Sequence, residues 1–259
     1  MKIKSLLVAM MAVSTLFLSS CSDDDDNNDD PAPEMKGSMF IKFDHVWGPS
    51  QAPFALNTEL VHPASGDTLE FTKLRYYISN IVLHNANGSD WAEEESYHLV
   101  EAGDQAGIEF ELPVDNVPAG NYTGISYMIG VDSLRNVSGA QEGALDPEEE
   151  MFWSWNTGYI FIKAEGQSNV APNGTFTYHL GGFQGAEKAF QENYHDFQGG
   201  VLEIMPDANP SVHLTANAAR FWHGGISTAQ TPMVHMPGPM AVTLATNFGG
   251  GFAFDHIHN

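Results

Sequence analysis

A histidine and a tryptophan two positions apart, His45 and Trp47, are the residues of this sequence best suited to metal chemistry. Side chains two apart on a β-strand project from the same face, so the two rings are expected side by side. A neutral imidazole is the commonest side-chain ligand of copper and zinc. A metal site needs a second histidine from another strand. The alternative is that His45 caps a strand edge and Trp47 belongs to the core.

The elements that would position these rings are predicted to be strands. Short apolar runs rich in Val, Ile, Tyr and Phe alternate with clusters of Gly, Asn, Asp and Pro, and no long stretch keeps a helical period. This pattern predicts an all-β fold, an antiparallel β-sandwich with long loops and few short helices. The expected strands are residues 39–46, 58–62, 68–71, 74–84, 95–101, 108–112, 122–131, 151–163, 175–182, 199–205 and 210–216.

Three details of this prediction bear on function. The strongest central strand, residues 74–84, carries Ser79 and Asn80 in its middle, which indicates a bulge or bend. Residues 132–150 are polar and form a long loop, a kind of segment that often carries function. A helical turn is expected at residues 217–222, and residues 240–247 could form a last helix or strand.

The N-terminus has the layout of a lipoprotein signal. Lys2 and Lys4 precede an apolar run, residues 6–18, that is too short to span a membrane. The run ends in Leu-Ser-Ser-Cys, which resembles a bacterial lipobox. Residues 1–20 are therefore expected to be the signal peptide, with lipidation at Cys21. Because Cys21 is the single cysteine, the mature chain can form no internal disulfide.

An acidic segment follows the lipobox, and residues 21–36 are expected to be a disordered tether. Its Ser22 and aspartates resemble the surface-export signal of Bacteroidetes lipoproteins; the alternative is a plain solvated spacer. We expect a lipid-anchored outer-membrane protein that faces outward. The chain has 10 Lys and Arg against 33 Asp and Glu, a balance that disfavours nucleic acid and anionic lipid as partners.

Residues 37–259 are expected to form one domain, and five stretches within it resemble the MbnP-like domain family. They are residues 74–81, 130–141, 143–147, 151–159 and 178–182, the last reading Tyr-His-Leu-Gly-Gly. The resemblance covers most of residues 38–258. The family includes copper-binding proteins found beside methanobactin genes and copper-repressible surface proteins of methanotrophs. Some members carry several disulfides, which places this chain in a different branch.

The resemblance implies a particular metal site. In characterised members a monovalent copper ion is held by two histidines and by a tryptophan oxidised to kynurenine, two residues from one of them. His45 and Trp47 match that arrangement. His98 is the first candidate for the second histidine and His179 the next. A dihaem peroxidase-like partner, which would oxidise the tryptophan, and an outer-membrane transporter are implied by analogy.

Other residues offer alternatives for metal and ligand binding. Met233, His235, Met236 and Met240 form a third copper candidate or a flexible surface loop. His256 and His258 could chelate as a pair or belong to a frayed C-terminus. Trp153 and Trp155 could stack on a sugar or fill the core. Calcium is a second candidate ion, through the acidic loop residues Asp132, Asp146, Glu148, Glu149 and Glu150.

The expected function is therefore a surface-anchored protein that captures or hands on copper. The alternative is a glycan- or protein-binding adhesion module of a Bacteroidetes surface complex that uses no metal. The sequence contains no nucleophile elbow, P-loop, HExxH segment or dinucleotide fingerprint, so a non-enzymatic role is expected.

Overall fold

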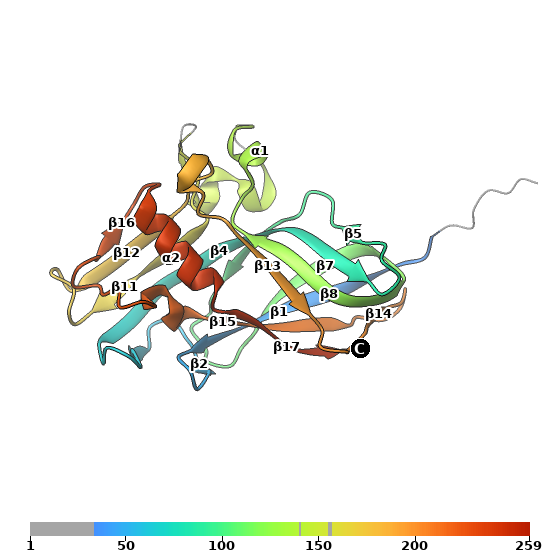
Figure 1. Cartoon of the computed structure of the whole chain (residues 1–259), viewed down its shortest axis with the longest axis horizontal. Helices are drawn as coiled ribbons and strands as arrows, with labels where there is room; N and C mark the ends of the chain where they lie inside the picture. The colour runs from blue at the N-terminus through green and yellow to red at the C-terminus, as the bar shows by residue number, and fades with distance from the viewer. Residues whose placement is uncertain (1–33, 140, 155–156) are drawn as a thin grey trace, which may run out of the picture. The chain divides into compact units, whose positions relative to one another are not determined.

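Two β-sheets, A and B, form the framework of the computed structural model, which describes residues 34–139, 141–154 and 157–259 (Figure 1). The predicted signal peptide, Cys21 and most of the predicted tether lie outside these ranges. The first strand begins at Lys36, where the predicted tether ends. Glu34–Asn259 form one compact unit.

Sheet A contains β1 (Lys36–Trp47), β2 (Ala52–Pro53), β7 (Phe110–Pro118), β15 (Ser211–Asn217) and β17 (Phe252–His258). Sheet B contains β3 (Glu59–Val61), β4 (Thr68–Asn85), β5 (Trp91–Ala92), β6 (Tyr97–Glu101), β8 (Gly120–Ile129), β11 (Ile162–Ser168), β12 (Thr175–Leu180), β13 (Gln191–Asp196), β14 (Leu202–Ile204) and β16 (Met233–Val234). A separate ribbon pairs β9 (Phe152–Ser154) with β10 (Gly158–Tyr159). The helical segments are α1 (Ser133–Asn136), α2 (Pro239–Gly249), η1 (Gly143–Leu145), η2 (Pro147–Glu149), η3 (Gly185–Glu187) and η4 (Ala218–Trp222).

The two sheets pack against each other, which confirms the predicted all-β sandwich. The ring of Phe43 on β1 meets the rings of Tyr76 on β4 and Tyr127 on β8 edge-on, at centroid distances of 6.1 and 6.3 Å. Edge-to-face packing suits aromatic rings because the positive ring edge meets the negative ring face. Alternate residues of β1 supply the core, and Met39, Ile41 and Phe43 are fully buried.

The sheets are mixed, whereas the sequence pattern predicted antiparallel pairing throughout. β1 lies between β7, which is antiparallel to it, and β15, which is parallel. β12 and β16 also pair in parallel. A parallel pair needs a long crossover connection, and most of the chain lies between β1 and β15. Apolar alternation along a strand does not encode the direction of its neighbour.

The predicted bulge in the central strand is confirmed. Asn80 has φ of 53°, and the pairing of β4 with β8 shifts register between Ser79 and Val82. Asparagine tolerates this left-handed conformation better than most residues. At this bulge β4 changes its pairing: before it β4 pairs with β11, and β8 pairs with β4 on both sides of the bulge.

Several elements differ from the sequence expectation. Residues 151–163 split into β9, β10 and the start of β11, and Gly158, the first residue of β10, has φ of 72°. The C-terminus is not frayed, because β17 pairs with β15 along the edge of sheet A. β13 was not predicted at all: its alternate residues are exposed, so it lacks an apolar run.

The last apolar segment is a helix, α2, which packs on η4, β12 and β13 (Figure 1). Pro239 stands at its first turn, where a missing N–H costs no hydrogen bond. Ala241, Leu244, Ala245 and Phe248 recur on one face and are buried. Phe248 stacks on Phe221 of η4 with ring centroids 4.5 Å apart.

Candidate metal-binding site

The C-terminal end of β1 places His45 and Trp47 on the core face of sheet A, as their spacing predicts. His45 is 4% exposed and Trp47 is 6% exposed. Both rings pack near Phe54, at centroid distances of 6.3 and 6.5 Å. The two side chains therefore share one buried aromatic environment.

The imidazole of His45 is held neutral. Its Nε2 lies 3.1 Å from the hydroxyl oxygen of Tyr76, which is itself fully buried. Burial lowers the pKa of His45 to about 4, because a charged imidazole would lose its hydration. A neutral imidazole is the form that binds a metal ion.

This shift predicts a pH-dependent stability. Unfolding returns the pKa of His45 from about 4 to 6.5, so between these values the unfolded chain binds a proton that the folded chain does not. The free energy of unfolding should therefore be unaffected by His45 above pH 6.5 and fall by about 3 kcal/mol as the pH drops towards 4. Urea unfolding of wild type and His45→Gln at pH 7 and at pH 4.5 measures this. Glutamine can still bond the tyrosine hydroxyl but does not titrate, so an equal pH dependence in both proteins would contradict the prediction.

Trp47 lies at the centre of an aromatic cluster. Its Nε1 donates a hydrogen bond of 2.8 Å to the carbonyl oxygen of Val61. Its ring meets Phe71, Trp222 and His62 edge-on, at centroid distances of 6.0, 6.1 and 6.1 Å. The histidine ring that contacts Trp47 is thus His62, a residue that sequence reasoning placed at a strand end and did not consider as a ligand.

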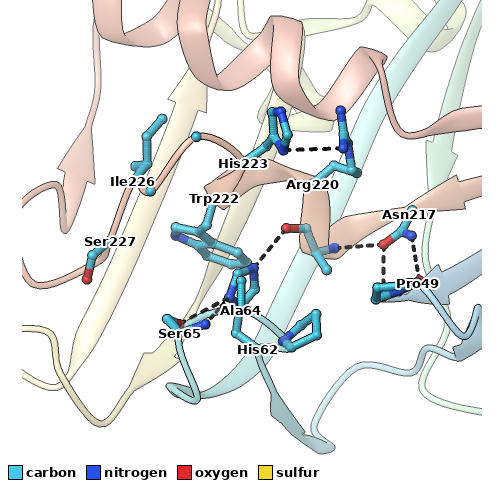
Figure 2. Close-up of a pocket in the computed structure, with 15 residues that line it drawn as sticks. Pro49, His62, Ala64, Ser65, Asn217, Arg220, Trp222, His223, Ile226 and Ser227 are labelled. Carbon is cyan, nitrogen blue, oxygen red and sulfur yellow. Dashed lines mark hydrogen bonds between the residues drawn. The ribbon is translucent and has the colours of Figure 1, made fainter.

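His62 forms part of the wall of a pocket of about 460 Å³ beside this cluster (Figure 2). His62 Nε2 lies 3.3 Å from the carbonyl oxygen of Ala219, which only accepts, so Nε2 carries the proton. His62 Nδ1 then accepts from the backbone N–H of Ser65 at 3.3 Å and lies 3.1 Å from the Ser65 hydroxyl. Trp222 and Ile226 supply apolar parts of the wall.

His98 lies on the same face of sheet B as the tyrosine that contacts His45. It pairs across β6 and β4 with Ile78, two residues from Tyr76, and opposite residues of neighbouring strands share a face. His98 Nε2 donates to the Glu93 carboxylate at 2.8 Å, which leaves Nδ1 with the lone pair. Ligating histidines commonly make such a carboxylate contact through their other nitrogen.

His179 lies on the opposite face of sheet B. It pairs with Lys163, which in turn pairs with Arg75, the neighbour of Tyr76 in β4. The sheet therefore stands between His179 and the ring that His45 contacts. His179 Nε2 donates to Glu165 at 2.7 Å, and its ring stacks on that of His235, with centroids 4.8 Å apart.

The family-model comparison decides the relationship of the chain to known proteins. The model of the MbnP family matches residues 36–237, most of the chain. The chain belongs to the MbnP family. The resemblance found in the sequence is thereby confirmed. The solved structure of MbnP from Methylosinus trichosporium is 16% identical, covers 80% of this chain and 87% of its own, and superposes with a TM-score of 0.51, which shows a similar fold. No curated protein sequence matches the chain.

The other candidate ligands of this MbnP-family chain lie at separate places. Met233, Met236 and Met240 are 62, 68 and 39% exposed, around the His235 that stacks on His179. His256 stacks on His213 with ring centroids 4.0 Å apart, and its Nδ1 lies 3.0 Å from Asp255. Within residues 34–139, 141–154 and 157–259, no group of three or more His, Cys, Asp or Glu is placed to hold a metal ion.

Four of the five acidic side chains proposed for calcium already have protein partners, which disfavours a calcium site in this loop. Asp132 caps α1 through Leu134 and Arg135, and Asp146 caps η2. Glu149 lies 3.0 Å from Arg75, and Glu150 lies 3.6 Å from Lys73. The calcium expectation therefore finds no support in the geometry of these carboxylates.

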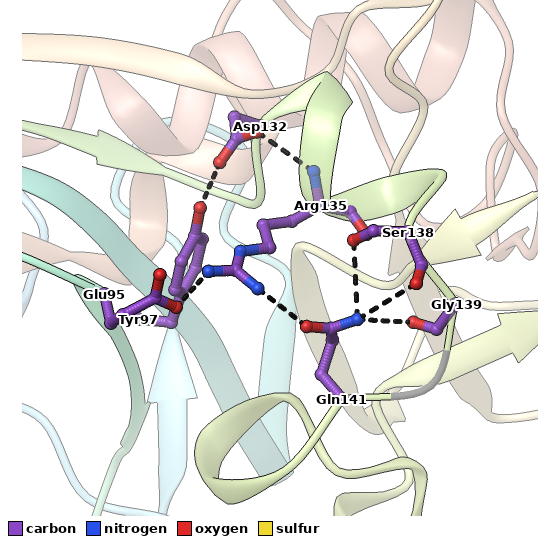
Figure 3. A network of polar contacts seen from close by, with 7 residues as sticks. All are labelled: Glu95, Tyr97, Asp132, Arg135, Ser138, Gly139 and Gln141. Carbon is purple, nitrogen blue, oxygen red and sulfur yellow. Dashed lines mark hydrogen bonds and ion pairs between the residues drawn. The ribbon is translucent and has the colours of Figure 1, made fainter.

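A polar network fixes this loop to β6 (Figure 3). Arg135 pairs with Glu95, donates to Gln141 at 2.8 Å, and lies over the ring of Tyr97, 5.3 Å from its centroid. The hydroxyl of Tyr97 in turn donates to Asp132. The contacts of Arg135, Gln141 and Asp132 therefore hold the loop in place, and these side chains are engaged with protein partners.

The aromatic segment suggested for glycans packs inward where it is described. Tyr159 is fully buried, donates to the carbonyl of Leu145 at 2.8 Å, and meets the ring of Phe152 at 4.9 Å. Trp153 is half-buried against Gly181, while Trp155 lies outside the described residues.

Among the described helices, none is both long and apolar enough to cross a bilayer.

Proposed function

We propose that this MbnP-family chain is a copper-binding lipoprotein of the outer membrane, anchored through Cys21, that captures or hands on copper. Binding and transfer of copper need no catalytic step, so the proposed role in copper handling is non-enzymatic. A dihaem peroxidase-like partner acting on Trp47 and an outer-membrane transporter that receives the copper complete the proposal by analogy with the family.

The observation that carries this proposal is the pair of His45 and Trp47, buried side by side on β1. His45 has a neutral imidazole, the protonation state that copper requires, and its Nε2 contacts the hydroxyl of Tyr76. Trp47 is the proposed position of oxidation. Its indole is in contact with His62, which lines the pocket of about 460 Å³, so this pocket lies directly beside the cluster.

His98 is the proposed second ligand. It shares a sheet face with the tyrosine beside His45, and its carboxylate partner leaves one nitrogen with a free lone pair. Two imidazole nitrogens suit monovalent copper, which accepts low coordination numbers and needs no cluster of three or more charged ligands. His179 lies on the other face of the sheet, so it could bind copper only at a separate site.

A copper(I) titration of the whole chain tests the site. Wild type is expected to bind one equivalent, and His45→Ala is expected to lose it. His195→Ala is the matched control, because His195 also contacts a tyrosine hydroxyl, that of Tyr127 at 3.0 Å, and also has a pKa lowered by burial. Unchanged binding by His45→Ala would show that the assignment is wrong.

The second ligand is identified by the same titration. His98→Ala is expected to weaken binding as strongly as His45→Ala, whereas His179→Ala and His62→Ala should retain the equivalent. If His62→Ala lost its equivalent of copper and His98→Ala still bound one, His62 and not His98 would be the second ligand. The site would then lie beside the pocket that His62 lines.

A further inference from the structure

A serine, a histidine and an aspartate form a hydrogen-bonded chain on the outer face of sheet B, away from the proposed copper site. The hydroxyl oxygen of Ser126 lies 2.9 Å from Nε2 of His84, and Nδ1 of His84 lies 2.9 Å from a carboxylate oxygen of Asp90. A carboxylate only accepts, so Nδ1 carries the proton and Nε2 is left to accept from the serine. This is the tautomer in which a histidine acts as a general base towards a serine.

The fold brings these residues together from three segments. Ser126 lies on β8 and His84 on β4, two neighbouring strands of sheet B. Asp90 lies between β4 and β5, six residues after His84. Backbone pairing of β4 with β8 holds Ser126 and His84, and Asp90 directly precedes β5, which pairs back onto β4.

A tyrosine on the next strand holds the histidine ring. Tyr194 of β13 lies directly opposite Ser126 and meets the His84 ring edge-on at 5.2 Å. It reaches across β8 over Gly124, where a Cβ would lie 3.2 Å from the tyrosine hydroxyl. The absence of a side chain at Gly124 therefore lets the ring close over the histidine.

A pocket of about 410 Å³ opens beside the serine. Ser126, Met128, Glu192, Tyr194 and the bulge residue Asn80 line it. The side-chain amide of Asn80 makes no hydrogen bond to any described residue, and it shares the pocket wall with Ser126. An amide N–H in such a place can donate to an oxyanion that forms at the serine.

We propose that Ser126, His84 and Asp90 form a nucleophilic triad that hydrolyses small esters. The Ser126 oxygen attacks the acyl carbon, its proton passes to His84 Nε2, and that proton then goes to the departing alkoxide as its C–O bond breaks. A water molecule, deprotonated by His84, next attacks the acyl-serine carbon. The C–O bond to Ser126 breaks, the carboxylic acid leaves, and His84 returns the proton to the serine oxygen. Asn80 donates to the carbonyl oxygen while it carries negative charge.

The surroundings of the pocket select the class of ester. Glu192 lines the pocket and Asp90 stands behind the histidine, so an anionic substrate would be repelled. Met128 and the exposed ring of Tyr194 offer apolar contact. Short acyl esters that are uncharged or cationic therefore fit best.

Hydrolysis of p-nitrophenyl acetate by the whole chain, with labelling by a fluorophosphonate, tests the proposal. Wild type should hydrolyse the ester and carry the label on Ser126, and Ser126→Ala should lose both by roughly 100-fold or more. His84→Gln should lower the rate similarly. Ser38→Ala is the matched control, because Ser38 donates to Asp115 at 2.7 Å on another strand and has no histidine beside it.

Three outcomes would overturn the triad: no turnover or labelling of wild type, an unchanged rate in Ser126→Ala, or a label on another serine. Copper titration of Ser126→Ala separates this proposal from the proposed function. Because the triad lies on the outer face of sheet B and His45 in the core, the variant should bind copper as wild type does.

Discussion

Replacing Trp47 with alanine is expected to lower the free energy of unfolding by about 3–5 kcal/mol, the range for a large aromatic removed from a packed core. The indole is 6% exposed and contacts the rings of Phe54, Phe71 and Trp222 in addition to that of His62. Its removal leaves a cavity in this cluster and an unpaired carbonyl at Val61. Urea unfolding at pH 7, followed by circular dichroism, measures the loss.

Two further variants separate the causes of this effect. Trp47→Phe keeps most of the ring contact but loses the N–H, so it should cost only about 1–2 kcal/mol. Trp91→Ala is the control at a half-buried tryptophan on β5, and its loss should be clearly smaller than that of Trp47→Ala. A loss below about 1 kcal/mol in Trp47→Ala would contradict the central position assigned to this ring.

The second large effect is expected at Asn136, whose buried amide ties the long loop to the ribbon that follows. Its Nδ2 donates to the carbonyls of Val131 and Asp132 at 2.7 and 2.8 Å, and its Oδ1 accepts from the backbone N–H of Tyr159 at 2.9 Å. Asn136→Ala removes the side-chain partner of two backbone groups at buried residues, the Val131 carbonyl and the Tyr159 N–H, and should cost about 3–5 kcal/mol. The Asp132 carbonyl keeps its bond from the backbone N–H of residue 136.

The control for this variant is Asn247→Ala. Asn247 also donates twice to backbone carbonyls, those of Phe221 and His223 at 3.1 and 3.0 Å, but it is partly exposed and water can replace its bonds. The expected loss is about 1 kcal/mol. Equal losses in the two variants, measured by thermal and urea unfolding, would show that burial does not set the cost at Asn136.

The proposed copper site shows how far strand periodicity carries a prediction. The spacing of His45 and Trp47 placed both rings on one face, and the structure confirms that shared face. Periodicity cannot tell which residues of other strands meet that face. His62 contacts Trp47 although it lies just beyond a three-residue strand, a position with no apolar signal. Its partners Ala219 and Trp222 are more than 150 residues away.

Pairing register separated two candidates that the sequence could only rank, His98 first and His179 second. His98 and His179 both stand on predicted strands with alternating polarity. One face of sheet B carries His98 and the other carries His179, because of how each strand aligns with β4 and β11. A shift by one residue would exchange the faces, and only the assembled sheet sets that alignment.

The amino-acid sequence alone determined the all-β class, most strand positions, the bulge at Asn80 and the MbnP resemblance, because alternation and turn residues are local signals. The tertiary structure decided the parallel pairing of β1 with β15, the contact of His62 with Trp47, and the meeting of Ser126, His84 and Asp90. These features depend on strand neighbours and register, which are set by packing between segments distant in the chain.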